Sequence, residues 1–277
     1  MDNKMENEKF NNFFDFELLM QKYQSKLWTI PFIGGILLFI LLISCYLITS
    51  FVRGYPLIWL VSDIGGSSPV AGYFSQGVDI FCLMFIFSAY LRCKQVEYYI
   101  KRIIIRSDNQ QVNNPKMIKK LQEKNYQSFI SAIICSIGFM MIANFNTYEH
   151  FIEHSIATGF MFGIIFFLLS QTFIAEKLYE CNQIESRPIS LKIVTYIITF
   201  GWPLITAIFV CSLLLNGSLF DWFKLEQRLY WPSDSPSYHL YRFGVIIEWL
   251  VIMSYSPALI ILSYRMRSFK HWNLIFY

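Results

Sequence analysis

Two acidic residues lie inside long apolar stretches of the sequence. They are Asp79 and Glu248. If these stretches cross a membrane, a carboxylate there is costly, so such groups usually face the interior of a helix bundle and have polar partners. One hypothesis is a polar core that binds a ligand or carries protons. The other, which we favour, is a structural pair hydrogen-bonded to Asn144, His154 or Gln171, and these five residues are the candidate polar core.

A second group of titratable residues falls at or just beyond the ends of apolar stretches. It consists of Asp63, His154, Glu226 and His239. A histidine among acids can change charge at about pH 5–6 and sense an acidic compartment. The alternative, which we favour, is that these side chains make hydrogen bonds that hold loops onto helix ends.

Known catalytic and metal-binding motifs are missing from the sequence. It contains no G-x-S-x-G, no H-E-x-x-H, no P-loop and no Rossmann glycine series. Its six cysteines form no C-x-x-C pair and no Cys/His metal spacing. We therefore expect no catalytic residues, no metal and no cofactor.

The composition indicates an all-α, polytopic membrane protein. Hydrophobic residues make up 55% of the chain and charged residues only 15%, whereas soluble domains carry about 25% charged residues. About 20 apolar residues cross a hydrocarbon core of about 30 Å. Six such blocks predict one bundle of six transmembrane helices over residues 28–264, with spans at about 28–52, 70–91, 128–145, 154–175, 191–215 and 242–264.

The distribution of Lys and Arg predicts the orientation. An N-terminal tail (1–27), a polar connection (92–127), residues 176–192 and a basic tail (265–277) hold 19 of the 23 basic residues. Basic residues favour the cytosolic side, so both termini and the 92–127 connection are expected in the cytosol. The net charge of +4 then belongs to a cytosolic basic belt and does not indicate a nucleic-acid partner.

One part of this basic belt could attract anionic lipid headgroups. It is a cluster of four lysines, Lys116, Lys119, Lys120 and Lys124. The alternative, which we favour, is a solvated loop.

Two glycines in the fourth predicted span form a G-x-x-x-G pattern. They are Gly159 and Gly163, and such spacing lets two helices approach closely. We expect the pattern to serve packing within the chain rather than dimerisation.

Several short motifs resemble a known family. Ser62-Asp63-Ile64-Gly65 and Pro69 precede an apolar run that ends in Tyr90-Leu91-Arg92-Cys93-Lys94-Gln95-Val96, and Leu225–Trp231 reads LEQRLYW. Together with Ala143-Asn144-Phe145, His154, Gln171-Thr172, Tyr238 and Glu248-Trp249, they resemble the damage-regulated autophagy modulator (DRAM) family, within the wider FGF-receptor-activating and GPI-remodelling group. The sequence departs from the family pattern at Asp79, where Asn is expected, and at Ala157, where Gly is expected.

This resemblance implies a non-catalytic protein of the lysosomal or endosomal membrane that promotes autophagy, with the Golgi or plasma membrane as alternatives. Its implied partners are membrane lipids, anionic headgroups at the cytosolic face and autophagy-related proteins, with no nucleic acid. The family-like motif on the lumenal side consists of Asp63, Gly65, Glu226, Trp231, Tyr238 and Trp249.

Two other functions stay open. A lipid-remodelling membrane enzyme or its cofactor would need His154, Glu226 or Glu248 to converge on one pocket. A proton-coupled transporter would use Asp79 and Glu248.

Overall fold

The predicted all-α fold with six membrane-crossing helices is confirmed. The computed structural model describes residues 25–53, 59–110, 115–147, 149–181, 183–217, 220 and 231–275, without the side chains of residues 53 and 106–110. Within these residues, regular structure is entirely helical, and six helices are long and apolar enough to span a membrane. This is expected of a chain in lipid, because a helix satisfies its own backbone hydrogen bonds.

The six spans comprise eight helical segments, because two spans are interrupted. The helices are α2 (Thr29–Arg53), α4 (Ala71–Gln110), α5 (Pro115–Asn144), α6 (Phe151–Met161), α7 (Gly163–Glu180), α8 (Ile189–Leu215), α10 (Tyr238–Met253) and α11 (Tyr255–Arg267). A short helix, α3 (Val61–Gly65), lies between the first two spans, and a 3₁₀ turn, η2 (Trp272–Leu274), follows the last.

Proline chemistry accounts for the break between α10 and α11. Pro257 has no N–H to bond the Met253 carbonyl and its ring crowds that carbonyl. The helix accordingly ends at Met253 and resumes at Tyr255. Between α6 and α7, Phe162 N–H instead bonds to Gly159 O, three residues back, at 3.3 Å. This local tightening separates the two halves of the fourth span.

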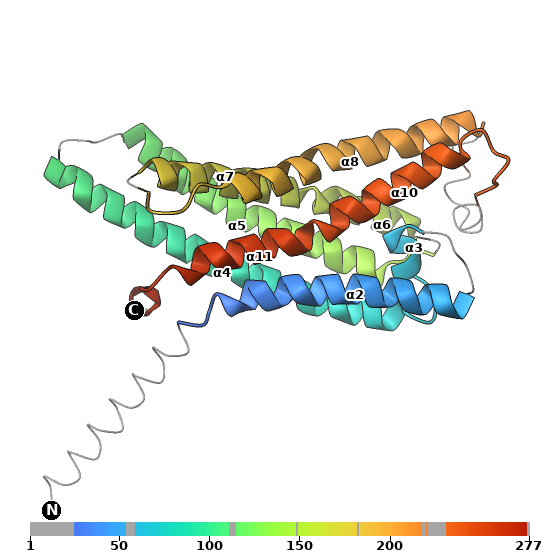
Figure 1. The fold of residues 1–277 in the computed structure, drawn as a ribbon, viewed down its shortest axis with the longest axis horizontal. Helices are drawn as coiled ribbons and strands as arrows, with labels where there is room; N and C mark the ends of the chain where they lie inside the picture. The colour runs from blue at the N-terminus through green and yellow to red at the C-terminus, as the bar shows by residue number, and fades with distance from the viewer. Residues whose placement is uncertain are drawn as a thin grey trace, which may run out of the picture.

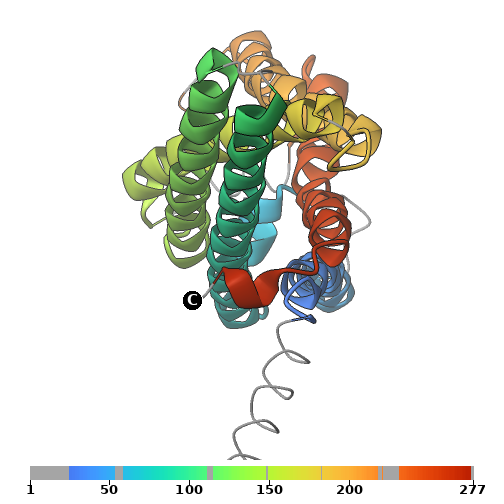
Figure 2. The same ribbon diagram turned by 90° about the vertical axis from the view of Figure 1, so that its left-hand side faces the viewer.

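The helices form a ring in which each span packs against the next along the chain. α2 packs against α4, α4 against α5, α5 against α6 and α7, α7 against α8, and α8 against α10. α11 returns to α2 and closes the ring, with α3 on the inside (Figure 2). We call the end that carries the start of α2, the α4–α5 connection and η2 the basic end, and the opposite end the α3 end (Figure 1).

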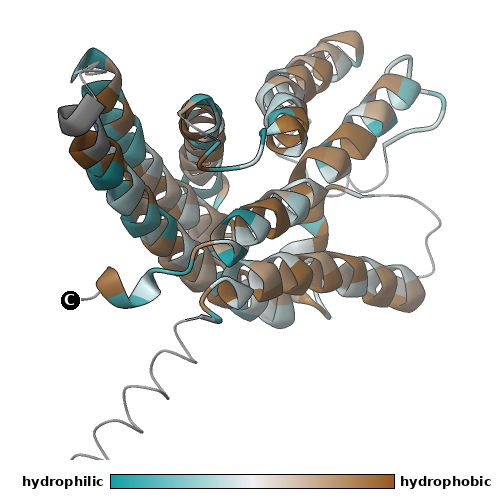
Figure 3. Cartoon of the chain, turned by 60° about the vertical axis from the view of Figure 1, so that its left-hand side comes forward, coloured by the Kyte–Doolittle hydropathy of each residue, from teal (hydrophilic) through white to brown (hydrophobic). Residues whose placement is uncertain are grey.

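The polar connection expected at residues 92–127 is mostly helical. The prediction of a loop at its lysine cluster is therefore wrong. α4 continues to Gln110 and α5 already begins at Pro115. Charged residues mark where an apolar span leaves the membrane, but Lys, Arg, Gln and Glu also favour helix. The two helices therefore project past the expected span ends, and hydrophilic residues gather toward their connected ends (Figure 3).

The two glycines of the G-x-x-x-G pattern have different surroundings. A Cβ on Gly163 would lie 2.7 Å from Ser131 O of α5, so this glycine allows close contact within the chain. A Cβ on Gly159 would meet nothing within 4 Å. From the α5 side, a Cβ on Gly138 would lie 2.7 Å from both Ala157 O and Met161 N. Internal packing therefore involves Gly138 and Gly163 rather than the complete pattern.

We predict opposite effects for alanine at these glycines. Gly138→Ala should lower the free energy of unfolding by about 1–3 kcal/mol, because the added methyl group overpacks a backbone contact. Gly159→Ala should leave stability unchanged or raise it by up to about 1 kcal/mol, since alanine favours helix over glycine. Unfolding of the purified variants in detergent measures both, and equal destabilisation would contradict the assigned contact.

Candidate functional site

A cavity of about 370 Å³ lies inside the ring toward the α3 end. Its wall is mostly apolar and is contributed by α2, α3, α4, α5, α6, α8 and α10. Small-molecule sites typically occupy about 300–1,000 Å³ and combine apolar walls with a few placed polar groups. The cavity therefore has the size and the lining of a ligand site.

Three titratable side chains are among the described residues that line this cavity. Glu248 Oε2 accepts a hydrogen bond from Val61 N–H at 3.1 Å, and Asp63 Oδ1 accepts one from Thr147 Oγ1 at 3.0 Å. His154 Nδ1 lies 2.7 Å from Phe145 O. A carbonyl oxygen only accepts, so Nδ1 carries a proton and donates it to Phe145 O.

The short helix α3 packs against α2, α4 and α5, and α10 reaches it and the residues just before it through two hydrogen bonds. Besides the Glu248 contact with Val61, Trp249 Nε1 donates to Trp59 O at 2.7 Å. Gly65 lies directly against the Phe74 ring, where a Cβ would come within 2.4 Å. A larger residue would push α3 off α4, which explains a glycine at this place.

The family-like residues therefore fall into two groups. Asp63 and Gly65 lie in α3, and Trp249 donates a hydrogen bond to Trp59 O just before it. Trp231 instead stacks on Tyr241 at a centroid distance of 4.2 Å and donates to Ser237 Oγ at 3.0 Å.

Tyr238 and Glu226 are the remaining members of the family-like motif. The Tyr238 hydroxyl accepts from Arg242 Nη1 at 3.0 Å, which places Tyr238 with the second group, at the start of α10. Glu226 lies outside the described residues.

The candidate polar core is divided among three places. Glu248 and His154 line the cavity together. Asp79 accepts from Asn144 Nδ2 at 3.1 Å between α4 and α5, and neither residue lines the cavity. Gln171 lies in a separate polar cluster toward the basic end.

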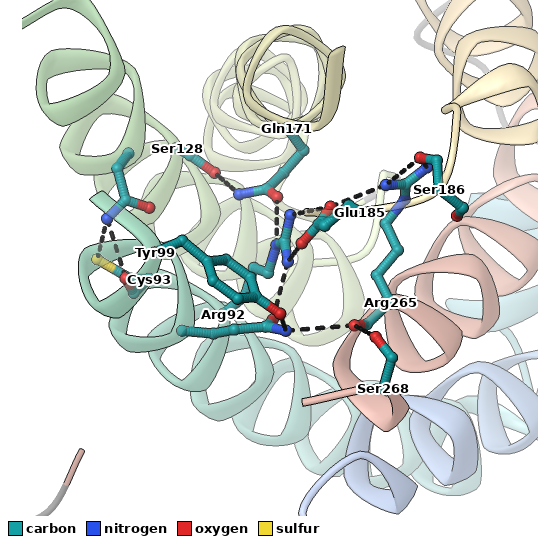
Figure 4. Close-up of polar contacts among 11 residues, drawn as sticks. Arg92, Cys93, Tyr99, Ser128, Gln171, Glu185, Ser186, Arg265 and Ser268 are labelled. Atoms are coloured by element: carbon teal, nitrogen blue, oxygen red, sulfur yellow. Dashed lines mark hydrogen bonds and ion pairs between the residues drawn. The ribbon is translucent and has the colours of Figure 1, made fainter. Parts of the chain in front are cut away.

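That cluster is built around a buried carboxylate between two arginines. Arg92 is 0% exposed and forms ion pairs with Glu185 through Nη1 and Nη2, the latter at 3.0 Å (Figure 4). Arg265 Nη1 donates to the same carboxylate at 2.8 Å. Burial raises the pKa of Glu185, but the two guanidinium groups outweigh burial and hold that pKa below its ordinary value.

Neutral side chains accept further hydrogen bonds from Arg92 in this buried ion cluster, which we define as Arg92, Glu185 and Arg265. Arg92 Nε donates to Gln171 Oε1 at 2.9 Å, and Gln171 Nε2 donates to Ser128 Oγ at 2.8 Å (Figure 4). Gln95 Oε1 accepts from Arg92 Nη1 at 2.8 Å. Together with Gln171 of α7 and Ser128 of α5, the ion cluster joins α4, α5, α7, the α7–α8 connection and α11.

Sequence reasoning identified Gln171 but missed Glu185 and Arg265. The available signal was weak. Glu185 is one acidic residue in a short polar connection, and Arg265 follows the last apolar run in a tail expected to be basic. Their burial depends on contacts between residues 93 and 80 positions apart.

The structure thus defines an integral, multi-pass helical membrane protein with an internal, mainly apolar cavity. The chain belongs to the family described as the Frag1/DRAM/Sfk1/Cwh43P N-terminal domain, whose family model matches residues 26–269. This confirms the resemblance identified from the sequence motifs.

One relative is DNA damage-regulated autophagy modulator protein 2 of Bos taurus. This chain is 21% identical to it over 201 residues, which cover 72% of this chain and 68% of the relative. No solved structure matches the chain. Within the described residues, no group of three or more His, Cys, Asp or Glu could hold a metal ion.

We predict that Glu185→Gln lowers the free energy of unfolding by about 3–5 kcal/mol, because it leaves two buried arginines without a carboxylate. Glu180→Gln is the matched control, since Glu180 makes a partly exposed ion pair with Lys177. This substitution should change the free energy of unfolding by about 1 kcal/mol or less. Chemical unfolding in detergent compares the two variants. Equal stability of both would contradict the role given to the ion cluster.

The lowered pKa of Glu185 also predicts a pH dependence of stability. A carboxyl group whose pKa is lower in the folded state contributes stability above its unfolded pKa, about 4.3, and loses it as pH falls through the folded pKa. The contribution should therefore stay constant from pH 7 to about pH 5.5 and decline only below about pH 4.3. Unfolding measured against pH should show this acid loss in the native protein and a smaller loss in Glu185→Gln.

Proposed function

We propose that this protein promotes autophagy from the lysosomal or endosomal membrane, without catalysis, by binding a lipid or a protein partner. The similarity to known proteins carries the proposal. The family model covers nearly the whole chain, and a relative that is 21% identical over 201 residues is named as an autophagy modulator. A binding role fits the cavity, which offers a mainly apolar wall and few polar groups.

The described hydrogen bonds of the titratable cavity residues hold structural elements in place. His154 bonds to a backbone carbonyl, Glu248 to a backbone N–H and Asp63 to the Thr147 hydroxyl. Each of these contacts fixes a helix end or α3.

We further propose that the basic end faces the cytosol and contacts anionic lipid. Lys116, Lys119 and Lys120 are exposed on the first turns of α5, and their spacing places them along one side of the helix. Each basic residue near an anionic surface contributes about 1 kcal/mol of attraction. This region therefore suits contact with the headgroups of the cytosolic leaflet.

The test is localisation of a tagged full chain in starved cells together with measurement of autophagic flux. We expect residence in lysosomes or endosomes and reduced flux on depletion, restored by the native chain. Depletion without any change in flux would overturn the proposal, wherever the protein resides. A chain carrying Glu180→Gln, a surface change, is the control for rescue.

A second candidate, a lipid-remodelling membrane enzyme or its cofactor, is favoured by one observation. Glu248 and His154 converge on one cavity, as this function would require. Golgi or plasma-membrane residence with normal flux would favour it. The proton-coupled transporter has no such support, because Asp79 does not line the cavity that Glu248 lines.

A further inference from the structure

We propose that α10 and the half of α8 at the α3 end move outward as one unit, and that this movement widens the gap between α6 and α8 that leads to the cavity. We call this unit, residues 203–215 of α8 together with α10, the movable pair. The inference rests on the proposed function, in which the cavity binds a ligand, and deepens it by describing how the cavity opens. Four features carry it: a hinge, a tightly packed pair of helices, a gap and a latch.

The hinge lies where two neighbouring spans each carry a proline. Pro203 lies inside α8 and Pro257 near the start of α11. Neither has an N–H to bond the carbonyl four residues back, and sharp helix bends usually occur at such places. Both prolines are exposed on the outside of the bundle. They therefore fill no place in the core, and their main effect is on the backbone of these two spans.

Trp202 brings the two prolines together in space. Its Nε1 donates to the Tyr255 hydroxyl at 2.9 Å, and both side chains are buried. Its ring also contacts Phe162, at the break between α6 and α7, with a centroid distance of 5.7 Å. Three spans thus depart from regular helical hydrogen bonding around one residue of the cavity wall. The hinge is defined by Trp202 with Pro203 and Pro257.

The two helices of the movable pair are packed closely enough to move together. A Cβ on Gly244 of α10 would lie 2.7 Å from Ile208 Cγ2 of α8. The rings of Phe209 and Tyr241 meet at a centroid distance of 5.6 Å. In contrast, α6 stays on α5, where Gly138 allows backbone contact. The boundary between the movable pair and the rest of the ring therefore lies between α8 and α6.

The gap at this boundary reaches the cavity. α6 and α8 are not among the helix pairs in extended contact within the described chain (Figure 1). Ser155 of α6 and Thr206 and Val210 of α8 line the cavity and are also exposed at the protein surface. In a membrane, this surface faces lipid. A wider gap therefore gives a ligand in the bilayer more room to reach the cavity.

Two hydrogen bonds form a latch that holds the movable pair inward. Glu248 accepts from Val61 N–H at 3.1 Å, and Trp249 Nε1 donates to Trp59 O at 2.7 Å. α3 is fixed on the other side, because it packs against α2, α4 and α5. The Trp249 ring also meets Tyr46 of α2, at a centroid distance of 5.6 Å. Outward movement has to break these contacts, and each hydrogen bond has only a modest net strength.

Distances between spin labels on α6 and α8 test the movement. The labels are attached to Ile152→Cys and Leu214→Cys, two exposed positions near the α3 end. The full chain is purified into nanodiscs, with the three cysteines that are not buried replaced by serine, namely Cys93, Cys181 and Cys211. A rotation of about 15° moves the end of an arm of roughly 18 Å by about 5 Å. We expect a main distance and a minor one that is longer by about this amount.

A label pair at the basic end is the matched control. Tyr126→Cys of α5 and Ile193→Cys of α8 are exposed positions on helices that the ion cluster and α7 hold together. This pair should give one distance. Two distances at both ends would show general flexibility of the bundle and would overturn a hinge at Trp202.

Variants of the latch and of the hinge should shift the populations in opposite directions. Trp249→Phe removes one hydrogen bond of the latch and should raise the longer-distance population about two- to tenfold. Trp28→Phe, at the basic end beside Arg267, is its control and should change nothing. Pro203→Ala with Pro257→Ala restores two backbone N–H groups at exposed helix positions, so this variant should fold and lose the longer distance.

Three results would overturn the proposal. They are a single distance in both the native chain and Trp249→Phe, equal effects of Trp249→Phe and Trp28→Phe, and a longer-distance population that the two alanines leave unchanged. The distances are measured without a ligand and without cells. A rigid α8 and α10 with intact dependence of autophagic flux on the protein would therefore refute the movement and leave the proposed function standing.

Discussion

The carboxylate of Glu185, buried between Arg92 and Arg265, is the interaction on which the rest of the bundle depends. Its partners come from α4 and α11, and the carboxylate itself sits on the α7–α8 connection. These elements lie on different sides of the ring, so the ion cluster joins helices that are not neighbours along the chain. A buried carboxylate without its cations would cost several kcal/mol, which disfavours any arrangement that separates them.

A ring held together at one end can be open at the other. Toward the basic end, α7 packs on both α5 and α8. Beyond the break at Phe162, α6 stays with α5 while α8 continues with α10. The cavity occupies the space left by this divergence, and α3 lies at its inner end, held by Glu248 and Trp249. α10 therefore supplies both a carboxyl group of the cavity and hydrogen bonds to α3 and to Trp59 just before it.

Composition and apolar periodicity were sufficient to predict the fold class and the existence of six spans. They did not predict how far α4 and α5 extend, because charged residues end a membrane span without ending a helix. The site was predicted in part. A carboxyl group deep in an apolar run has to face inward, so Glu248 could be found, but the same rule gave Asp79, which Asn144 satisfies between two helices. Glu185 could not be found, because its burial is set only by tertiary contacts.

The central claim is that the ion cluster around Glu185 joins the bundle at its basic end, while α6 and α8 separate at the α3 end. A cryo-electron microscopy map of the full chain in nanodiscs of native lipid tests it most directly. The account predicts Glu185 between Arg92 and Arg265 at the basic end, and separated α6 and α8 at the α3 end. Contact between α6 and α8 along their whole length, or an exposed Glu185 away from both arginines, would contradict it.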